Sequence, residues 1–417
     1  MNVLQRVFCR VYQTAFQMAL PVLPYREPQR FDRVADLAPL LEKLQVTSVL
    51  LVTDFHLRTA GITGELEALL ARLGIHCAVY EGVQPNPTVD NVEEALALYH
   101  RDGCQCLIAM GGGSSMDCAK AVGARVTYPN RGLNQLKGNL RILRKIPPLI
   151  AIPTTAGTGS EVTLTAVITD SAAKHKYTMN SFPLIPSHAV LDPSVTVSLP
   201  PHLTATTGMD ALTHAVEAYL GNSTSRQTRA WALEAVSLVF ANIEIAYQDG
   251  ANLQARANML KAAYLAGAAF SQSYVGYVHA VAHSLGGQYG IPHGLANAVL
   301  LPVFLEAYGA KIHKKLHKLA IAAGLATEET PRMEAAEAFI RAVRGLNHRM
   351  NIPETLPGIR REDIPQMARH AGREANPLYP VPVLMNSRQL QWFYYKVAEE
   401  RNAHGRSTHQ ANPGKPA

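Results

Sequence analysis

The feature that most constrains this chain is the alternation of short apolar runs and helical stretches between residues 46 and 152. The apolar runs are residues 46–53, 75–80, 105–110 and 148–152. They are short and several are rich in β-branched residues, which is typical of parallel strands buried on both faces. Stretches with helical spacing, at 63–73 and 89–100, lie between them. This order predicts an α/β fold with a doubly wound parallel sheet.

After Pro200 and Pro201 the composition changes to long runs rich in alanine and leucine, with helical spacing from 206 to 349. Paired prolines often mark the end of a structural element. We therefore predict an all-α C-terminal domain and four parts of the chain: a helical extension at 1–30, an α/β domain at 31–199, a helical domain at 200–403 and a disordered tail at 404–417.

The composition, 47% hydrophobic and 17% charged, excludes a disordered chain. The net charge of +7 is concentrated at the two ends, where residues 1–33 hold five arginines against two acids and residues 401–417 hold three basic residues and no acid. A nearly neutral body predicts no nucleic-acid partner. No unbroken apolar run reaches about 18 residues, which predicts no membrane partner. Five cysteines without a CxxC spacing predict a reduced, cytoplasmic protein.

Residues 1–26 contain Arg6 and Arg10, no acid, and apolar residues at roughly helical spacing. Such a segment is compatible with an organelle-import presequence, which would make the location organellar. The alternative is an amphipathic helix packed on the body or on a partner subunit. We favour the helix because the serine enrichment of presequences is missing. An apolar helix of this kind also predicts a homodimer or a larger homo-oligomer.

A glycine turn joins the strand ending at Met110 to the next helix. Gly111–Gly113 allow close approach of a phosphate, and the helix start offers free N–H groups and the positive end of its dipole. Ser114 can cap that helix or donate to a phosphate. Asp54 follows the first strand, where an acid in dinucleotide-binding folds bonds the ribose hydroxyls and repels a 2′-phosphate. The alternatives are a structural turn for the glycines and a helix N-cap for Asp54.

A set of metal-ligand side chains lies in the helical half. Asp210 and His214 are four residues apart, His279 and His283 repeat that spacing, and His293 follows. Residues at i and i+4 project from one face of a helix. One carboxylate and several imidazoles are typical of a first-row divalent metal site with an open position, and ligand type alone does not separate iron from zinc or manganese.

Four motifs resemble the iron-containing (group III) alcohol dehydrogenases. They are GGGSSMDCAK (111–120), PTTAGTGSEVT (153–163), GMDALTHAVEAY (208–219) and VHAVAHSLGGQYGIPHGLANAVLLP (278–302). The resemblance runs from about residue 30 to 400, and the motifs stand in the family's order. It implies a dinucleotide-binding α/β domain, a helical metal-binding domain, a dehydroquinate-synthase-like architecture and an active site in the cleft between the domains.

The resemblance also implies roles for individual residues. Asp210, His214, His279 and His293 match the metal ligands, and His283 matches a histidine that stays off the metal and faces the nicotinamide and substrate. Asp54 matches the position that selects NAD over NADP. The other matched cofactor contacts are Asn86, Gly112, Gly113, Ser114, Asp117, Thr154, Thr155, Thr158, Thr163, Thr165 and Lys176. Tyr277, Ser284 and the stretch at 376–388 depart from the family pattern.

The function that this predicts is reversible hydride transfer between NAD and a short primary alcohol or diol, with Fe²⁺, or alternatively Zn²⁺, acting as a Lewis acid on the substrate oxygen. An alternative is a hydroxyacid–oxoacid transhydrogenase that keeps its nicotinamide bound. A lyase or cyclase similar to dehydroquinate synthase would need more basic residues for an anionic substrate than Lys176 alone. A non-enzymatic protein would be expected to lack a ligand, and none is missing.

Overall fold

The computed structural model describes residues 1, 3–171 and 175–399, and this part of the chain forms two compact units. The α/β unit comprises Pro24–Leu199 and Gly250–Ser271. The helical unit comprises Met1–Leu23, Pro200–Asp249 and the chain from Gln272 onward. The predicted tail at 404–417 lies outside the described residues.

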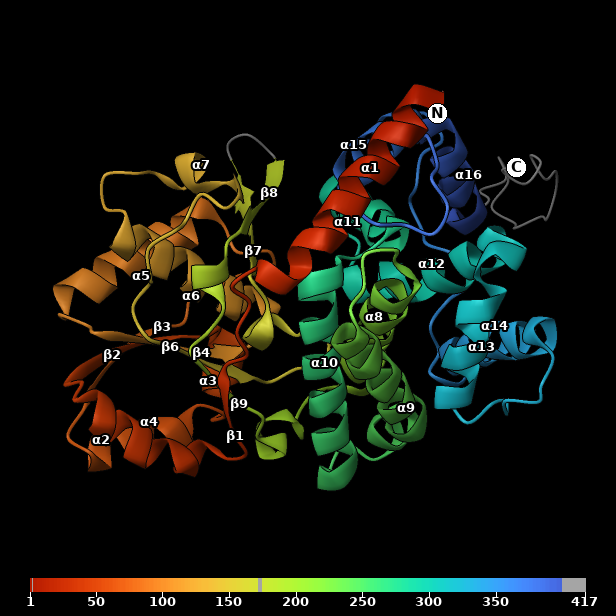
Figure 1. The fold of residues 1–417 in the computed structure, drawn as a ribbon. Helices are drawn as coiled ribbons and strands as arrows, with labels where there is room; N and C mark the ends of the chain where they lie inside the picture. The colour runs from red at the N-terminus through yellow and green to blue at the C-terminus, as the bar shows by residue number, and fades with distance from the viewer. Residues whose placement is uncertain (2, 172–174, 400–417) are drawn as a thin grey trace. The chain divides into compact units, whose positions relative to one another are not determined.

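A parallel sheet forms the centre of the α/β unit (Figure 1). Its strands are β1 (Gln29–Phe31), β2 (Ser48–Val52), β3 (His76–Tyr80), β4 (Cys106–Gly111), β6 (Leu149–Pro153) and β9 (His188–Val190). Their order is β1-β9-β6-β4-β2-β3, and every neighbouring pair is parallel. The four strands predicted from the apolar runs are present, and the predicted fold class is confirmed.

Helices cover both faces of this sheet because successive side chains of a strand point to opposite sides. Leu50 and Val52 of β2 join one core with α5 (Val89–Arg101) and α6 (Gly113–Thr127). Val49 and Leu51 join the other core with α2 (Ala38–Leu44) and α4 (Gly64–Arg72), on the opposite side of the sheet in Figure 1. The other helices between residues 24 and 199 are α3 (Phe55–Thr59), α7 (Leu133–Leu136), η2 (Val34–Leu37), η3 (Ser160–Val162), η4 (Phe182–Leu184) and η5 (Pro193–Thr196).

A second, smaller sheet has the order β5-β8-β7. Strand β7 (Thr165–Asp170) pairs antiparallel with β8 (His175–Asn180), and β5 is Gly138–Asn139. Residues 172–174, which follow β7 and precede β8 in the sequence, lie outside the described part of the chain.

The helical unit is built almost entirely of helices. They are α1 (Val3–Ala19), η1 (Leu20–Val22), α8 (Pro201–Leu220), α9 (Arg226–Gln248), α11 (Tyr277–Tyr289), α12 (His293–Tyr308), η6 (Gly309–Ile312), α13 (His313–Ala322), α14 (Arg332–Arg349), α15 (Ile364–Ala375) and α16 (Ser387–Val397). Helix α1 is a continuous helix over most of the predicted N-terminal extension.

One helix after residue 200 belongs to the α/β unit, whereas the domain boundaries predicted at 31–199 and 200–403 would place it in the helical domain. Most of α10 (Leu253–Ser273) belongs to the α/β unit. A side chain at Gly267 would lie 2.8 Å from the carbonyl oxygen of Gly159, so two glycines let these backbones meet. Arg256 donates to the carbonyl of Leu199, which ties the start of the helix to the same unit. Such contacts leave no periodic signal in the sequence.

Two helical stretches, Arg226–Gln248 and His293–Ala322, are long and apolar enough to cross a membrane by length and composition alone. The unbroken-run criterion used on the sequence does not detect them. A buried core helix has the same length and composition, and most of the second stretch is buried inside the protein. These two helices are therefore weak evidence for a membrane span.

Candidate active site

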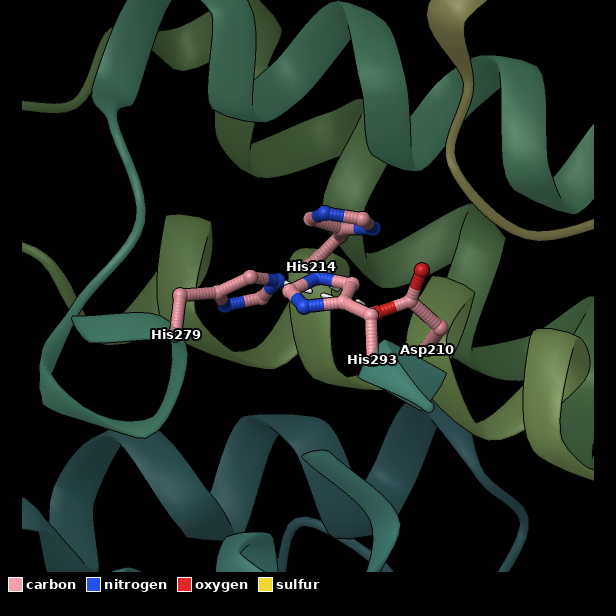
Figure 2. A group of neighbouring side chains, drawn as sticks. All are labelled: Asp210, His214, His279 and His293. Carbon is pink, nitrogen blue, oxygen red and sulfur yellow. Dashed lines mark ion pairs between the residues drawn. The ribbon is translucent and has the colours of Figure 1, made fainter. Parts of the chain in front are cut away.

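Four predicted metal ligands come together in the helical unit. Asp210 and His214 project from α8, His279 from α11, and His293 is the first residue of α12. One ligand atom from each residue lies within 4.8 Å of the corresponding atoms of the others. Figure 2 shows the four side chains converging from these three helices. The i, i+4 spacing of Asp210 and His214 on α8 can be predicted from the sequence. The approach of α11 and α12 to α8 depends on the tertiary structure.

The geometry inside the cluster is close. The Asp210 Oδ1 atom lies 3.5 Å from His293 Nε2 and 3.8 Å from His279 Nε2. The rings of His214 and His279 stack with centroids 4.4 Å apart. Gly294 permits this approach, because a β-carbon there would lie 2.4 Å from the carbonyl oxygen of Thr206 on α8. The start of α12 is thereby pressed against α8, which brings His293 to Asp210.

Glu217, one helical turn beyond His214 on α8, orients His279. Its carboxylate accepts hydrogen bonds from the backbone N–H groups of Gly276 (2.7 Å) and Val278 (2.8 Å) and pairs with His279 Nδ1 at 2.6 Å. Burial raises the pKa of Glu217 to about 7, and hydrogen bonds from the backbone N–H groups of Gly276, Val278 and His279 act against that rise. A carboxylate on the far ring nitrogen is the usual arrangement behind a metal-binding histidine.

The chemistry of the cluster fits a divalent metal. Burial, together with three neighbouring histidines, keeps the pKa of His279 well below its ordinary value, so this ring is neutral. Its Nδ1 faces Glu217, and its Nε2 is buried with no hydrogen-bond partner among the described residues. A buried nitrogen lone pair aimed at a carboxylate and two imidazoles is poorly satisfied by protein alone. The donor set of one carboxylate and three imidazoles suits a first-row divalent ion.

Asn297 supports two of the ligands from the next turn of α12. Its Nδ2 donates to Asp210 Oδ1 at 2.6 Å and lies 3.1 Å from His293 Nε2. Asp210 is 3% exposed and Asn297 is fully buried. The amide therefore holds the carboxylate in place from inside the protein.

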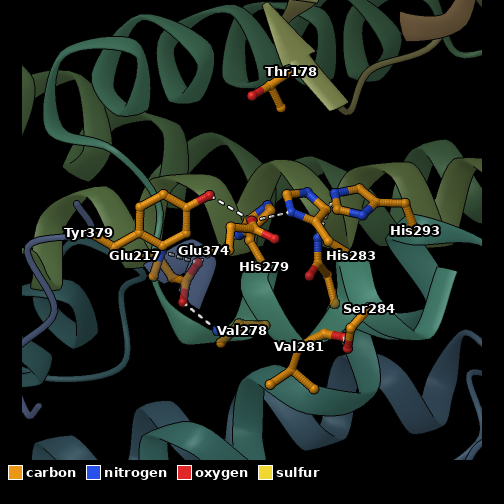
Figure 3. A network of polar contacts seen from close by, with 12 residues as sticks. Thr178, Glu217, Val278, His279, Val281, His283, Ser284, His293, Glu374 and Tyr379 are labelled. Atoms are coloured by element: carbon orange, nitrogen blue, oxygen red, sulfur yellow. Dashed lines mark hydrogen bonds and ion pairs between the residues drawn. The ribbon is translucent and has the colours of Figure 1, made fainter. Parts of the chain in front are cut away.

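His283 lies beside the cluster and outside the set of four. Its ring stacks on His293 with centroids 5.1 Å apart, and its Nδ1 lies 2.6 Å from Glu374 Oε1. The same carboxylate oxygen accepts a hydrogen bond from the Tyr379 hydroxyl at 2.7 Å. Figure 3 shows this chain from Tyr379 through Glu374 to His283. With the carboxylate oxygen as acceptor of this contact, the His283 proton is assigned to Nδ1 and the lone pair to Nε2.

Tyr277 and Ser284, two of the residues that depart from the family pattern, contact the segment that carries Tyr379. The Tyr277 hydroxyl accepts from the backbone N–H of Met385 and contacts Asn376 Oδ1 at 2.9 Å. Ser284 Oγ lies 2.5 Å from the Tyr394 hydroxyl on α16. These contacts join α11 to residues 376–394, behind His283.

The glycine loop in the α/β unit has the predicted geometry. Strand β4 ends at Gly111 and α6 begins at Gly113, with Gly112 as its N-cap residue. A β-carbon at Gly113 would lie 2.8 Å from Thr158 Cγ2, so only glycine fits there without a shift. Thr155 and Thr158 are partly exposed beside the loop. The open N-terminus of α6 can therefore receive a pyrophosphate.

Asp54 has the structural role that was its alternative interpretation. It is the N-cap of α3, and its Oδ1 accepts from the backbone N–H groups of His56 and Leu57 at 3.0 Å. Capping by one oxygen is compatible with a cofactor contact through the other. Asn86 adopts a left-handed backbone with φ 63°, donates its N–H to Ser114 Oγ and accepts from Lys176 Nζ at 2.8 Å. Burial lowers the pKa of Lys176.

The other predicted cofactor residues make hydrogen bonds within the α/β unit or are buried in it. Asp117 accepts from Ser160 Oγ and from the backbone N–H of Val167. Thr154 and Thr163 are buried, and Thr163 Oγ1 accepts from Lys120. Thr165 Oγ1 donates to Asn180. Their matched cofactor contacts stay predictions.

Lys120 is the buried centre of this polar group. Its Nζ donates to Ser160 Oγ, to the carbonyl and hydroxyl oxygens of Thr163 and to the carbonyl of Thr165, over 2.8–3.0 Å. Burial lowers the pKa of Lys120 to about 8, and nearby Asp117 opposes that shift. The side chain thus joins α6 to the chain around residues 160–165.

We expect Lys120→Met to lower the free energy of unfolding of the α/β unit by about 3–5 kcal/mol, because it leaves Asp117 and four oxygens without their cation. Urea unfolding measures the change. Lys145→Met, at an exposed lysine of the same unit, is the matched control and should stay within about 0.5 kcal/mol. Equal stability of the two variants would contradict the central role of Lys120.

Comparison with known families agrees with both halves of this description. The model of the iron-containing alcohol dehydrogenases matches residues 29–193, and the model of the C-terminal domain of the Fe-containing alcohol dehydrogenase family matches residues 204–397. The chain belongs to the iron-containing alcohol dehydrogenase family. It is thus an oxidoreductase, and the family suggested by the four motifs is confirmed.

Characterised alcohol dehydrogenases of this family span nearly the same length. The 1,3-propanediol dehydrogenase of Klebsiella pneumoniae is 38% identical over 365 residues, which cover 87% of this chain and 93% of the relative. Alcohol dehydrogenase 4 of Saccharomyces cerevisiae (strain YJM789) is 39% identical over 347 residues, 81% of this chain and 88% of the relative.

Solved structures of alcohol dehydrogenases and related reductases have the same fold. A 1,3-propanediol oxidoreductase superposes with a TM-score of 0.85 at 37% identity, covering 89% of this chain and 99% of that one. The sulfoacetaldehyde reductase of Bifidobacterium kashiwanohense, solved in complex with NAD⁺, superposes with a TM-score of 0.80 at 28% identity, covering 89% and 98%.

Several polar residues at the metal cluster and near the glycine loop of this dehydrogenase were not predicted from the sequence. Glu217 and Asn297 carried a usable signal, since they stand one helical turn from His214 and His293. Glu374 lies 91 positions after His283, and nothing in the local pattern joins the two. Lys120 is not marked by any local pattern, because only the tertiary structure shows its burial.

Proposed function

We propose that this protein is an NAD-dependent alcohol dehydrogenase that transfers a hydride reversibly between a short primary alcohol or diol and the nicotinamide. The observation that carries the proposal is the convergence of Asp210, His214, His279 and His293 on one point, with the buried Nε2 of His279 facing it. We propose that these four residues hold a divalent metal, Fe²⁺ in keeping with the family, with Zn²⁺ as the alternative.

A bound divalent ion would supply Lewis acidity, which lowers the pKa of a coordinated alcohol and polarises an aldehyde carbonyl. The residues of the chain set up that chemistry. Glu217 and Asn297 orient His279 and Asp210, so the ligands need little rearrangement on binding. His283 lies on α11 one turn beyond His279, and its ring stacks on that of the ligand His293.

We propose that His283 takes up the alcohol proton at Nε2. Glu374 holds the Nδ1 proton at 2.6 Å, so the ring presents Nε2 as a base and its imidazolium form is stabilised once the proton arrives. The Tyr379 hydroxyl fixes Glu374 in turn. This arrangement resembles other enzyme sites in which a carboxylate orients a histidine base.

We propose that the loop from Gly111 to Ser114 receives the pyrophosphate of NAD and that Asp54 selects NAD over NADP. The open start of α6 and the tight approach of Thr158 to Gly113 support the first point. The NAD⁺ complex of the Bifidobacterium reductase supports the choice of cofactor. Substrates of the relatives, among them 1,3-propanediol and lactaldehyde by name, support a short alcohol or diol.

Asp54→Asn is expected to reduce the preference for NAD over NADP by about tenfold or more, because it removes a charge that repels the 2′-phosphate. Asparagine keeps an oxygen that can cap α3, so the fold is retained. The measurement is kcat/KM for each cofactor. Asp36→Asn, which removes an acid elsewhere in the unit, is the control. An unchanged cofactor ratio would contradict the selecting role of Asp54.

Anaerobic reconstitution tests the function as a whole. Chelator-stripped protein receives Fe²⁺ or Zn²⁺, and NADH formation is followed with a panel of short alcohols and diols. Turnover with metal and NAD supports the proposal. One bound metal per chain without turnover would overturn the alcohol substrate, and exchange between a hydroxyacid and an oxoacid without added NAD would replace it with the transhydrogenase. The cytoplasmic location and the homodimer stay predictions.

A further inference from the structure

Helix α1 of the helical unit turns an apolar stripe to the outside. Leu4 is 80% exposed, Phe8 61% and Val11 62%. Val3, Val7 and Met18 are exposed on the same side. With a turn of 3.6 residues, positions 3, 4, 7, 8, 11 and 18 lie on one face of the helix. Scattered exposed apolar side chains are ordinary, but a continuous stripe along a helix marks a contact surface.

Polar contacts hold α1 in this orientation. Gln13 is 3% exposed, and its Nε2 donates to the carbonyl of Tyr379 at 2.8 Å and to that of Pro377 at 3.2 Å. Arg10 donates to the carbonyls of Val381 and Pro382. Its inner face is thus anchored by hydrogen bonds to residues 377–382, whereas most surface helices bury their apolar face. The stripe is therefore built into the folded protein.

Cations flank the apolar stripe. Arg6 and Lys311 line a groove of about 500 Å³ together with Val7, Val11 and Leu384, and Arg10, whose guanidinium is bonded to the carbonyls of Val381 and Pro382, forms its base. Helix α1 contains no acidic residue, and residues 309–318, which include Lys311, contain four lysines and no acid. Lys318 pairs with Glu328 and Lys315 donates to the carbonyls of Leu220 and Gly221. The surface beside the stripe is thus both apolar and cationic.

We infer that α1 binds the surface of a membrane that contains anionic phospholipid. A helix lying in the interface buries its apolar face among acyl chains while flanking arginines and lysines meet the phosphates. A second copy of the chain fits less well, because a contact between two α1 helices has no acid on either helix to pair with Arg6. Binding at the interface needs no spanning helix, and it departs from the sequence-based prediction of no membrane partner. This inference is independent of the proposed function.

Vesicle flotation with the full-length protein tests it. We expect the protein to float with vesicles of phosphatidylcholine containing about a third phosphatidylglycerol at low salt, and to bind pure phosphatidylcholine at least about tenfold more weakly. About 0.5 M NaCl should reverse most of the binding, since the phosphate contacts are screened. Equal binding to both vesicles, or to neither, would overturn the inference.

Two double variants separate the apolar and cationic parts. Leu4→Gln with Phe8→Gln removes apolar stripe, and Arg6→Gln with Lys311→Gln removes charge at the groove. We expect the first pair to weaken binding about tenfold or more, and each lost cation to weaken it about fivefold. Met333→Gln, at an exposed residue of α14 that is 61% exposed, is the matched control and should bind like the wild type.

Tryptophan fluorescence detects the insertion of α1 into the membrane directly, without relying on a variant that loses binding. Phe8→Trp places an indole on the stripe, and its emission should shift to the blue with anionic vesicles beyond any change of the native Trp231 and Trp392. Sedimentation of the protein without lipid measures its oligomeric mass and tests whether the stripe is instead an interface between two copies of the chain. If Leu4→Gln with Phe8→Gln lowers the oligomeric mass of the wild type, the stripe is an interface between copies of this chain and the membrane assignment is wrong.

Discussion

Asp210→Asn is expected to cost the enzyme its bound metal and at least about a thousandfold of its rate of alcohol oxidation. The substitution keeps the size of the side chain and an oxygen for Asn297, but it removes the only negative charge among the four ligands. Lewis-acid stabilisation is worth several kcal/mol, and each 1.36 kcal/mol corresponds to a factor of ten in rate. Metal analysis of the purified protein and kcat with a short alcohol measure both effects.

His279→Ala should give the same result, because it removes the buried Nε2 that faces the cluster. His202→Ala is the matched control: it lies on the same helix as Asp210 and its side chain is exposed. The control should keep one metal per chain and full turnover. Stoichiometric metal and unimpaired turnover in both site variants would exclude the four residues as the metal site.

Glu374→Ala is expected to lower kcat about 10–100-fold while the metal content stays unchanged. The carboxylate holds His283 Nδ1 at 2.6 Å and accepts a hydrogen bond from the Tyr379 hydroxyl, so it joins this ring to Tyr379. Without it the ring can rotate and can carry its proton on the other nitrogen, so Nε2 is no longer a fixed base. Losses of this size are typical when the partner behind a functional histidine is removed.

Glu374→Gln separates positioning from simple loss of structure. Glutamine retains a carbonyl oxygen for His283 Nδ1, so kcat should recover to within several-fold of the wild type. His283→Ala, with full metal content, should lose the limb of the pH–rate profile that reports the base. An unchanged profile in His283→Ala, or unchanged kcat in Glu374→Ala, would show that the proton leaves by another route.

Local patterns in the sequence determined much of this protein. The alternation between residues 46 and 152 predicted the parallel sheet, because buried parallel strands are continuous apolar runs. The glycine turn was predictable because a strand, three glycines and a helix start are consecutive in the chain. The pair Asp210 and His214 was predictable because four residues make about one turn of helix.

Contacts between distant segments were decided only in the tertiary structure. Glu374 reaches His283 from another helix, Lys120 is buried by residues about 40 positions away, and α10 joins the α/β unit through two glycine backbones. The apolar stripe of α1 is exposed because the opposite, polar face of the helix is the one that packs on the protein. The hydrogen bond from Gln13 to the carbonyl of Tyr379 fixes that orientation. Periodicity shows which side chains share a face, whereas the partner of that face is set by packing and burial over the whole chain.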